Sequence, residues 1–241
     1  MLTLHDFDAR TIHGLEAGLT QQSLEDFLAA VRDQFGLANS VYVTPSPADP
    51  EPFVLTSYKD DWISHYRASR YEEIDPVYRI AARSVAPIDW EALPRGGRKV
   101  KRLFAEARDA GVGRQGLSIP IPGATPGSWG LFTATSDDND ADWELRRHLL
   151  TQTLVNVGHY VHQQMRQLRG EVSPVHPDAI TRREIQALQW IAGGLTVAET
   201  AVRMRIAEVT VKSHLDSARY KLGALTRSHA VAKALRGGLI R

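Results

Sequence analysis

The sequence predicts an α+β protein with two domains. The first is an N-terminal α/β/α sandwich, in which helices flank an antiparallel sheet, and the second is an all-α domain of four helices with a helix-turn-helix. Three observations predict this fold class. Short β-rich runs alternate with amphipathic helical patterns over residues 1–169. Residues 170–177 hold helix-breaking glycine and proline and are interpreted as a linker. Only helical patterns follow in residues 178–241.

Length and composition place the chain among soluble globular proteins. Its 241 residues suffice for two domains. The absence of cysteine excludes disulfides and thiolate zinc sites. No apolar run reaches the roughly 18 residues that a membrane helix needs, and the N-terminus lacks the apolar segment of a signal peptide. We therefore expect a cytoplasmic protein without a membrane partner.

The charge is unevenly divided between the two domains. The whole chain has a net charge of only +1. Residues 181–241 hold 11 Lys and Arg against 4 Asp and Glu, a net charge of +7, so the rest of the chain carries −6. A basic domain attached to an acidic one indicates that the C-terminal part meets a polyanion.

Patterns in the N-terminal domain predict its elements in order. A first helix is expected over residues 24–35, with Ser23 as its N-cap and Gly36 as its stop. Further helices are predicted over residues 61–71 and 99–111, and strands over residues 40–44, 53–58, 117–123 and 128–136. The last two strands are joined by a predicted hairpin turn, residues 123–127.

A long helix closes this domain, over about residues 141–169. Its apolar positions recur at steps of three and four and form one narrow stripe: Leu150, Leu154, Val157, Val161, Met165 and Leu168. Two interpretations stay open. The stripe packs on the domain's own sheet, or it pairs with a second copy of the helix and makes a homodimer, and the two are compatible.

An aromatic stripe with polar tips marks residues 58–90. Tyr58, Trp62 and Tyr66 stand four residues apart, Asp75 directly precedes a proline, and Trp90 follows the next helix. One interpretation is an aromatic core with satisfied hydroxyl groups. The other is a pocket in which these tips bind a ligand.

The C-terminal domain carries clear helix signals. Thr181 and Glu184 form a predicted capping box, Gly193 and Gly194 stop that helix, and Thr196 caps the next. In the third helix Val211, Leu215, Ala218 and Leu222 define a buried face.

The opposite face of this third helix is small, polar and basic. It holds Thr210, Lys212, Ser213, Asp216, Ser217 and Lys221. Such side chains reach base edges and phosphates when a helix enters the major groove of DNA. With Thr196 and Arg227 they are the predicted DNA contacts. A small helical interaction domain with a solvated basic face is the alternative.

Residues 181–240 resemble the C-terminal helix-turn-helix of LuxR-family regulators. The positions that carry the resemblance are Glu184, Leu188, Gly194, Thr210, Val211, His214, Lys221, Leu222, Gly238, Leu239 and Ile240. Asp216 stands where related proteins often carry a basic DNA contact. Its carboxylate either accepts a hydrogen bond from a cytosine amino group or pairs with Arg219.

The N-terminal domain resembles the acyl-homoserine-lactone pocket of the same family. The resemblance rests on the spacing of Tyr58, Trp62, Tyr66, Asp75 and Trp90, and on "EARDAGVGRQGLSIPI", which contains Gly116. It implies a signal ligand, no other cofactor and no enzymatic activity. It also implies a homodimer on near-palindromic promoter DNA, with RNA polymerase as a further candidate partner.

The resemblance implies a role for each pocket residue. The Trp62 indole N–H donates to the lactone carbonyl, Asp75 accepts the amide N–H, and the Tyr58 hydroxyl donates to the acyl carbonyl. Tyr66 and Trp90 pack on the ring. Ser118 or Thr133 adds a hydroxyl, and Trp129 flanks the acyl group.

Val43 and Trp129 favour a short, branched or aromatic acyl group over a long chain. A regulator that responds to a protein partner without any such ligand is the alternative function.

No other constellation predicts chemistry. The acid-rich residues 137–144 lack the glycine and terminal glutamate of a calcium loop, and His159 and His162 lack further ligands, so we expect no metal site. The acidic pocket and strand-end lysine of a phosphorylated receiver are also missing.

Overall fold

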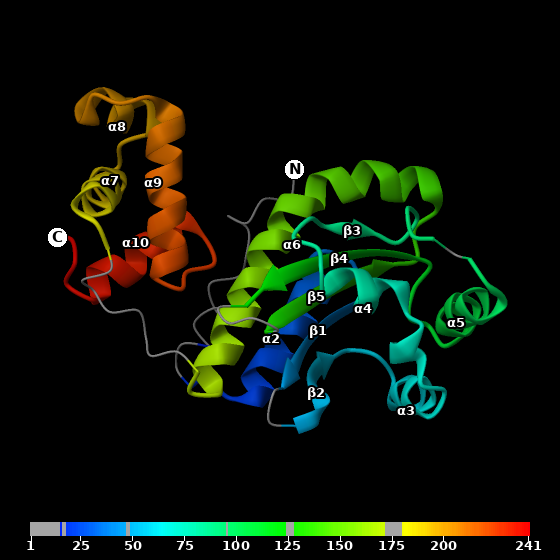
Figure 1. Cartoon of the computed structure of the whole chain (residues 1–241). Coiled ribbons are helices and arrows are strands. Elements are labelled where there is room, and N and C mark those ends of the chain that lie inside the picture. Colours follow the sequence, from blue (N-terminus) through cyan, green and yellow to red (C-terminus); the bar gives the residue numbers. More distant parts are fainter. Residues whose placement is uncertain (1–14, 16–17, 47–48, 95, 124–127, 172–179) are drawn as a thin grey trace. The chain divides into compact units, whose positions relative to one another are not determined.

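The computed structural model describes residues 15, 18–46, 49–94, 96–123, 128–171 and 180–241 (Figure 1). Its contacts divide the chain into two compact units, residues 1–162 and 163–241. Of the predicted linker only Gly170 and Glu171 are described, and the predicted hairpin turn at residues 124–127 lies outside the described residues.

A five-stranded antiparallel sheet is the centre of the first unit, in the order β2-β1-β5-β4-β3. Its strands are β1 (Asn39–Ser46), β2 (Asp49–Thr56), β3 (Ile88–Asp89), β4 (Gln115–Pro122) and β5 (Trp129–Ser136). The four predicted strands are confirmed. The short β3 was not predicted, because two residues are too few to show an alternating pattern.

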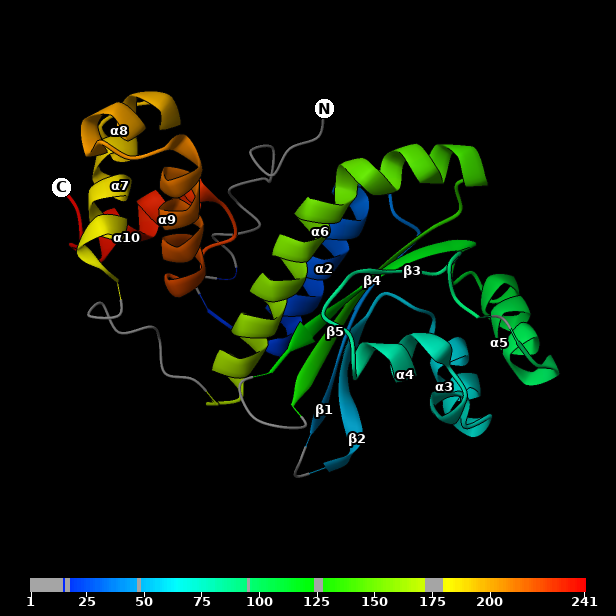
Figure 2. The same ribbon diagram turned by 45° about the horizontal axis from the view of Figure 1, so that its top comes forward.

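Helices cover both faces of this sheet (Figures 1 and 2). On one face lie α2 (Gln21–Gln34) and α6 (Asp140–Leu168). On the other lie α3 (Asp60–Ala68), α4 (Pro76–Ala81) and α5 (Arg98–Asp109), with the single turn η2 (Tyr71–Glu73) between α3 and α4. The predicted α/β/α sandwich is therefore confirmed.

The start of α2 differs from the prediction. Thr20, not Ser23, is the N-cap: its hydroxyl accepts the Ser23 N–H at 3.1 Å, and the Ser23 hydroxyl accepts the Thr20 N–H at 2.9 Å. Ser23 thus occupies the third helical position of a capping box, where its hydroxyl does what a Glu or Gln side chain usually does. The predicted stop is confirmed, since Gly36 adopts a φ of +54° just after the helix.

The apolar stripe of α6 is largely buried. Five of its residues are at most 3% exposed, namely Leu150, Leu154, Val157, Val161 and Met165. Leu168 is half-buried. The helix lies so close to β5 that a Cβ on Gly158 would stand 2.9 Å from the Cβ of Phe132.

At Gly158 the helix lies against β5, as the packing interpretation predicts, and dimerisation through these six residues stays a prediction. The spacing of three and four shows that a face is apolar, but it does not show what covers that face. The large apolar side chains that α6 does expose are Leu145 and Leu149, at 70% and 61%.

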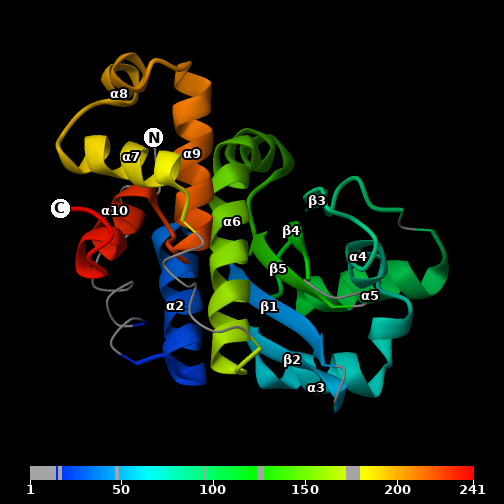
Figure 3. The ribbon, with the colours of Figure 1, turned by 60° about the vertical axis from the view of Figure 1, so that its left-hand side comes forward.

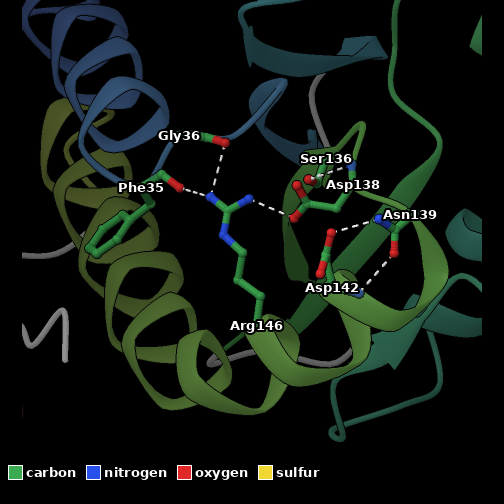
Figure 4. A network of polar contacts seen from close by, with 7 residues as sticks. All are labelled: Phe35, Gly36, Ser136, Asp138, Asn139, Asp142 and Arg146. Carbon is green, nitrogen blue, oxygen red and sulfur yellow. Dashed lines mark hydrogen bonds and ion pairs between the residues drawn. The ribbon is translucent and has the colours of Figure 1, made fainter.

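Arg146 fastens the first turns of α6 to the end of α2 (Figure 4). Its guanidinium donates to the carbonyl oxygens of Phe35 and of Gly36, the latter at 2.9 Å, and to Asp138 Oδ2 at 2.6 Å. A cation at the C-terminal end of a helix complements both its unpaired carbonyls and its dipole. Asn139 caps α6 by accepting the Asp142 N–H at 3.0 Å.

The second unit is a bundle of four short helices (Figure 3). They are α7 (Arg182–Ala192), α8 (Val197–Met204), α9 (Glu208–Lys221) and α10 (Arg227–Arg236). The predicted capping box at Thr181 and Glu184 is present, and Thr196 caps α8. Val211, Leu215 and Ala218 are at most 1% exposed and form the centre of the core.

Within the described part of the chain, no helix combines the length and the apolarity that crossing a membrane requires.

Candidate functional site

The sheet face under α3, α4 and α5 carries an aromatic cluster. It contains five of the eight predicted ligand-binding residues: Tyr58, Trp62, Tyr66, Trp90 and Trp129. The ring centroids of Trp62 and Tyr66 lie 6.0 Å apart, edge to face. The spacing of four residues places Trp62 and Tyr66 on one side of α3, and Tyr58 precedes this helix.

Asp75 joins this cluster through a hydrogen bond. Its Oδ2 accepts the Tyr66 hydroxyl at 3.0 Å, and its Oδ1 accepts the Val77 N–H at 2.8 Å as the N-cap of α4. Burial raises the pKa of Asp75, while the hydrogen bonds from Val77 and Tyr66 oppose that shift. The side chain is thus a fixed acceptor in a poorly solvated place.

Burial and the nearby Asp75 carboxylate both raise the pKa of Tyr58 and the pKa of Tyr66. Both phenols therefore stay protonated near neutral pH, and the Tyr66 hydroxyl donates to Asp75.

A chain of hydrogen bonds links Trp90 to the two predicted hydroxyl groups on the sheet. The indole Nε1 of Trp90 donates to Ser118 Oγ at 2.9 Å, and Ser118 Oγ lies 2.8 Å from Thr133 Oγ1. Ser118 and Thr133 face each other across β4 and β5. All eight predicted residues therefore belong to one connected group.

Gly116 makes room for Trp90. A Cβ built on Gly116 would lie 2.3 to 2.7 Å from three ring atoms of that indole. The backbone N–H of Trp90 also donates to the Gly116 carbonyl at 2.9 Å. Only glycine fits against the flat face of this ring, which explains a residue that the sequence marked by resemblance alone.

Trp129 begins β5 beside the cluster. Its ring meets that of Tyr78 edge to face, with centroids 4.9 Å apart. Leu131 and Thr133 follow at the spacing that keeps the same sheet face, and Val43 of β1 is the partner of Leu131 in the register.

Four residues in or beside the cluster were not predicted: Tyr71, His65, Arg102 and Glu106. Glu106 of α5 receives three donors: the Tyr71 hydroxyl, His65 Nε2 at 2.8 Å and Arg102 Nε at 2.6 Å. The hydrogen bonds from Tyr71, His65 and Arg102 lower the pKa of Glu106 to about 2.

Tyr71 is 5% exposed, and its ring contacts those of Trp62, His65 and Tyr66. Glu106 therefore connects α5 to α3 and η2, which contribute residues to the cluster. Its donors come from three different elements, so no local pattern indicated it.

The second candidate site is the exposed face of α9. Lys212, Ser213 and Asp216 are exposed on it, and Thr210 is half-buried at its start. Thr196 is exposed at the start of α8, where its hydroxyl lies 2.8 Å from Glu199 Oε2.

Two residues predicted for this face turn inward instead. Ser217 Oγ donates to Glu184 Oε1 at 2.6 Å, and Lys221 Nζ lies 2.8 Å from the same oxygen. Glu184 is 4% exposed. A buried carboxylate needs such donors, and they fasten α9 to α7. The helical period alone could not reveal this partner, because Glu184 lies on another helix.

Although burial alone would raise the pKa of Glu184, hydrogen bonds from Lys221, Ser217 and Thr181 outweigh it and lower the pKa to about 2.

Asp216 forms a hydrogen-bonded ion pair with Arg227 and also interacts electrostatically with Arg219. Arg227 Nε and Nη2 donate to Oδ1 and Oδ2 of Asp216, each at 3.0 Å. Arg227 is the first residue of α10, so this bidentate pair joins α9 to α10 at the exposed face.

Two families match the two parts of the chain. Residues 20–165 match the family described as "Autoinducer binding domain", and residues 178–234 match "Bacterial regulatory proteins, luxR family".

Named relatives agree with these matches. The transcriptional activator protein RaiR of Rhizobium etli is 34% identical over 180 residues, which cover 75% of this chain and 74% of RaiR. The transcriptional activator protein SolR of Ralstonia solanacearum is 30% identical, with 95% of this chain and 96% of SolR covered.

The quorum sensing-dependent transcriptional regulator RpaR of Rhodopseudomonas palustris is 34% identical, with 80% and 76% covered. Among solved structures, the N-acylhomoserine lactone dependent transcription factor CepR2 of Burkholderia cenocepacia shares the fold. Its TM-score is 0.54 at 22% identity, covering 65% of this chain and 93% of that one.

The relatives and the two family matches cover both units, and the family consists of transcriptional regulators rather than enzymes. The chain therefore belongs to the LuxR family of quorum-sensing transcriptional regulators, with an autoinducer-binding domain followed by a helix-turn-helix DNA-binding domain.

Proposed function

We propose that the autoinducer of this regulator is an acyl- or aryl-homoserine lactone, bound among the rings of the aromatic cluster. The observation that carries the proposal is the connection of buried aromatic rings to one poorly solvated carboxylate, Asp75. A homoserine lactone is neutral and amphiphilic, with one amide N–H and carbonyl groups to satisfy. Burying it requires one acceptor, several donors and apolar walls.

The polar anchors match that requirement. Asp75 accepts the amide N–H, because each of its oxygens has a second lone pair beyond the one that Val77 or Tyr66 uses. Trp62 donates to the lactone carbonyl and Tyr58 to the acyl carbonyl, with Ser118 or Thr133 as a further hydroxyl. Tyr66 and Trp90 pack on the ring. Trp129, with Tyr78 against it, flanks the acyl group and favours a short, branched or aromatic one.

Asp75→Asn tests the anchor without removing the helix cap, since asparagine is as good an N-cap as aspartate. The variant loses the charged acceptor, a change that costs roughly 1.5–3 kcal/mol for a hydrogen bond to a charged group. We expect the half-maximal signal concentration of a reporter strain to rise by about tenfold or more. Asp61→Asn, an exposed change on α3, is the matched control and should leave the curve in place.

The chemical class of the signal is tested by extraction. The full chain is purified from cells supplied with a mixture of homoserine lactones and is then extracted with organic solvent. Mass spectrometry identifies the molecules in the extract. Recovery of a homoserine lactone supports the proposal. Equal soluble yield with and without the mixture, together with an empty extract, would instead favour a regulator controlled by a protein partner.

On the DNA side we propose a homodimer on a near-palindromic promoter site, with α9 in the major groove. Thr210, Lys212, Ser213 and Arg227 are the proposed contacts on the exposed face around Asp216, and Thr196 is a proposed contact at the start of α8. The proposed autoinducer-binding domain then comprises residues 1–169, the linker residues 170–177 and the DNA-binding domain residues 178–241. The protein acts in the cytoplasm, with RNA polymerase as a further partner.

Footprinting tests this arrangement. Half-site centres are expected about one helical turn, ~10 bp, apart or a multiple of it. A footprint on one unsymmetric half-site, with a monomer by sedimentation, would contradict the dimer.

A further inference from the structure

The Asp216–Arg227 pair lies on the face that the proposed function assigns to DNA. Asp216 is exposed and stands four residues after Lys212 and three after Ser213, so the three side chains share one side of α9. Because both donor contacts to Asp216 measure 3.0 Å, the Arg227 guanidinium is held beside that same side. The side chains keep 51% and 35% of their surface exposed, so the pair is not sealed inside the fold.

The pairing leaves part of the guanidinium free. Asp216 takes one N–H from Nε and one from Nη2. Arginine has five N–H donors in a rigid plane, so the two on Nη1 and one on Nη2 remain. One Nη1 donor and the remaining Nη2 donor are parallel on a second edge of this plane, and the other Nη1 donor lies on the third. A plane fixed in this way can present two parallel donors to the O6 and N7 atoms of a guanine.

We propose that Asp216 is a positioning residue for DNA recognition: it holds the Arg227 guanidinium so that its free edge reads a base, and thereby sets the discrimination between a matched site and other DNA. The proposal rests on α9 as the DNA-reading helix. Asp216 itself carries a negative charge toward a polyanion, which weakens contact with any sequence. Its benefit is confined to the site where the oriented Arg227 finds its base.

This arrangement has a signature that a simple DNA contact lacks. Removing the carboxylate frees Arg227, so binding to the matched site falls. The same change removes a repulsive charge, so binding to unmatched DNA rises. A carboxylate that reads a cytosine amino group by itself would also lower binding to the matched site, but its effect would not depend on Arg227.

The experiment uses the full chain and two duplexes, one selected by the protein from a random library and one of scrambled sequence. Binding is measured over a series of salt concentrations for Asp216→Asn, Arg227→Lys and the double variant. Asp216→Asn should lower affinity for the selected duplex by about tenfold, as expected for one bidentate base contact. Its affinity for the scrambled duplex should rise by up to a few-fold.

The Arg227→Lys background decides whether the two residues act together. Lysine keeps the charge but lacks the planar fork. In that background we expect Asp216→Asn to cause no loss of affinity for the selected duplex, because only the removal of the repulsive charge remains. An undiminished tenfold effect in that background, or equal losses on both duplexes, would overturn the proposal.

Glu208→Gln serves as the matched control, because it removes an exposed carboxylate from the first turn of the same helix. It should shift affinity for both duplexes by similar factors. Failure of the unmodified protein to prefer any duplex from the library would count against α9 as the reading helix, and so against the proposed function rather than against the pair.

Discussion

At the scale of single residues, Gly116 shows how one missing side chain positions a wall of the proposed binding site. The Trp90 ring lies flat on its Cα, and the ring cannot withdraw easily because its Nε1 is bonded to Ser118. Glycine within a strand normally weakens the strand. Here the cost is offset by the close approach of an indole that carries a hydrogen-bond chain to Thr133.

Gly116→Ala should therefore destabilise the first unit, although a glycine-to-alanine change at a permissive site usually stabilises. The new Cβ would stand 2.3 Å from the nearest indole carbon, so ring and strand must shift. We expect a loss of about 1–3 kcal/mol in the free energy of unfolding, as for other overpacked cores. Chemical denaturation measures it. Gly96→Ala, where no atom lies within 4 Å, is the control and should be neutral or slightly stabilising.

Trp129 is the residue at which we expect acyl preference to be set. It shares a sheet face with Leu131 and Thr133, and Tyr78 packs on its ring. An indole covers about 150–250 Å² of surface, so a chain of ten or twelve carbons should meet it.

Short, branched or aryl-homoserine lactones should activate a reporter at lower concentration than the dodecanoyl compound, and Trp129→Ala should shift the ranking toward longer chains. A ranking led by the dodecanoyl compound in the unmodified protein would contradict this placement.

At the scale of elements, Glu184 joins α7 to α9 through hydrogen bonds and an ion pair. It closes the capping box of α7 through Thr181 and holds Ser217 and Lys221 of α9. The ion pair is nearly buried on the carboxylate side, so loss of one partner leaves a charge or an acceptor without compensation.

The stability of the second unit should depend on pH through these Glu184 contacts. Because the pKa of Glu184 is lowered from 4.5 to about 2 by folding, its contribution to stability is complete above about pH 4.5. That contribution is lost as the pH falls from about 4.5 through about 2.

Glu184→Gln keeps an acceptor for the Thr181 N–H. It should lower the free energy of unfolding at pH 7. The difference from the unmodified protein should shrink toward pH 3. If the difference in free energy of unfolding stays constant between pH 7 and pH 3, the charge of the carboxylate does not stabilise the contact between α7 and α9.

The α6 stripe illustrates what periodicity can and cannot predict. Its residues were correctly placed on one apolar face, because that follows from the helical period. Which surface covers the face depends on a distant contact, the approach of Gly158 to Phe132 on β5. If α6 takes part in self-association, its exposed Leu145 and Leu149 offer more surface for it than the buried stripe does.

At the scale of the whole molecule, the sequence predicted what local energetics determine. The Thr181 box, the Gly36 stop and the four longer strands depend on neighbours within a few residues, and all are confirmed. Contacts between distant segments were missed, such as Tyr71 with Glu106, 35 residues away, and Arg146 with Phe35, 111 residues away. A single sequence carries no signal for such pairs, since either partner could have met solvent instead.

The aromatic cluster also gives the protein an optical property. Of the five tryptophans, Trp62, Trp90 and Trp129 lie in the cluster, Trp143 is fully buried in α6, and Trp190 lies in the second unit under the Arg203 guanidinium. Indole emission responds to what touches the ring, so a molecule that enters the cluster would change the light from three of these five fluorophores directly. The unlabelled protein can then report its own signal occupancy in a cuvette, and a Trp190→Phe variant would show how much of the change comes from the DNA-reading unit.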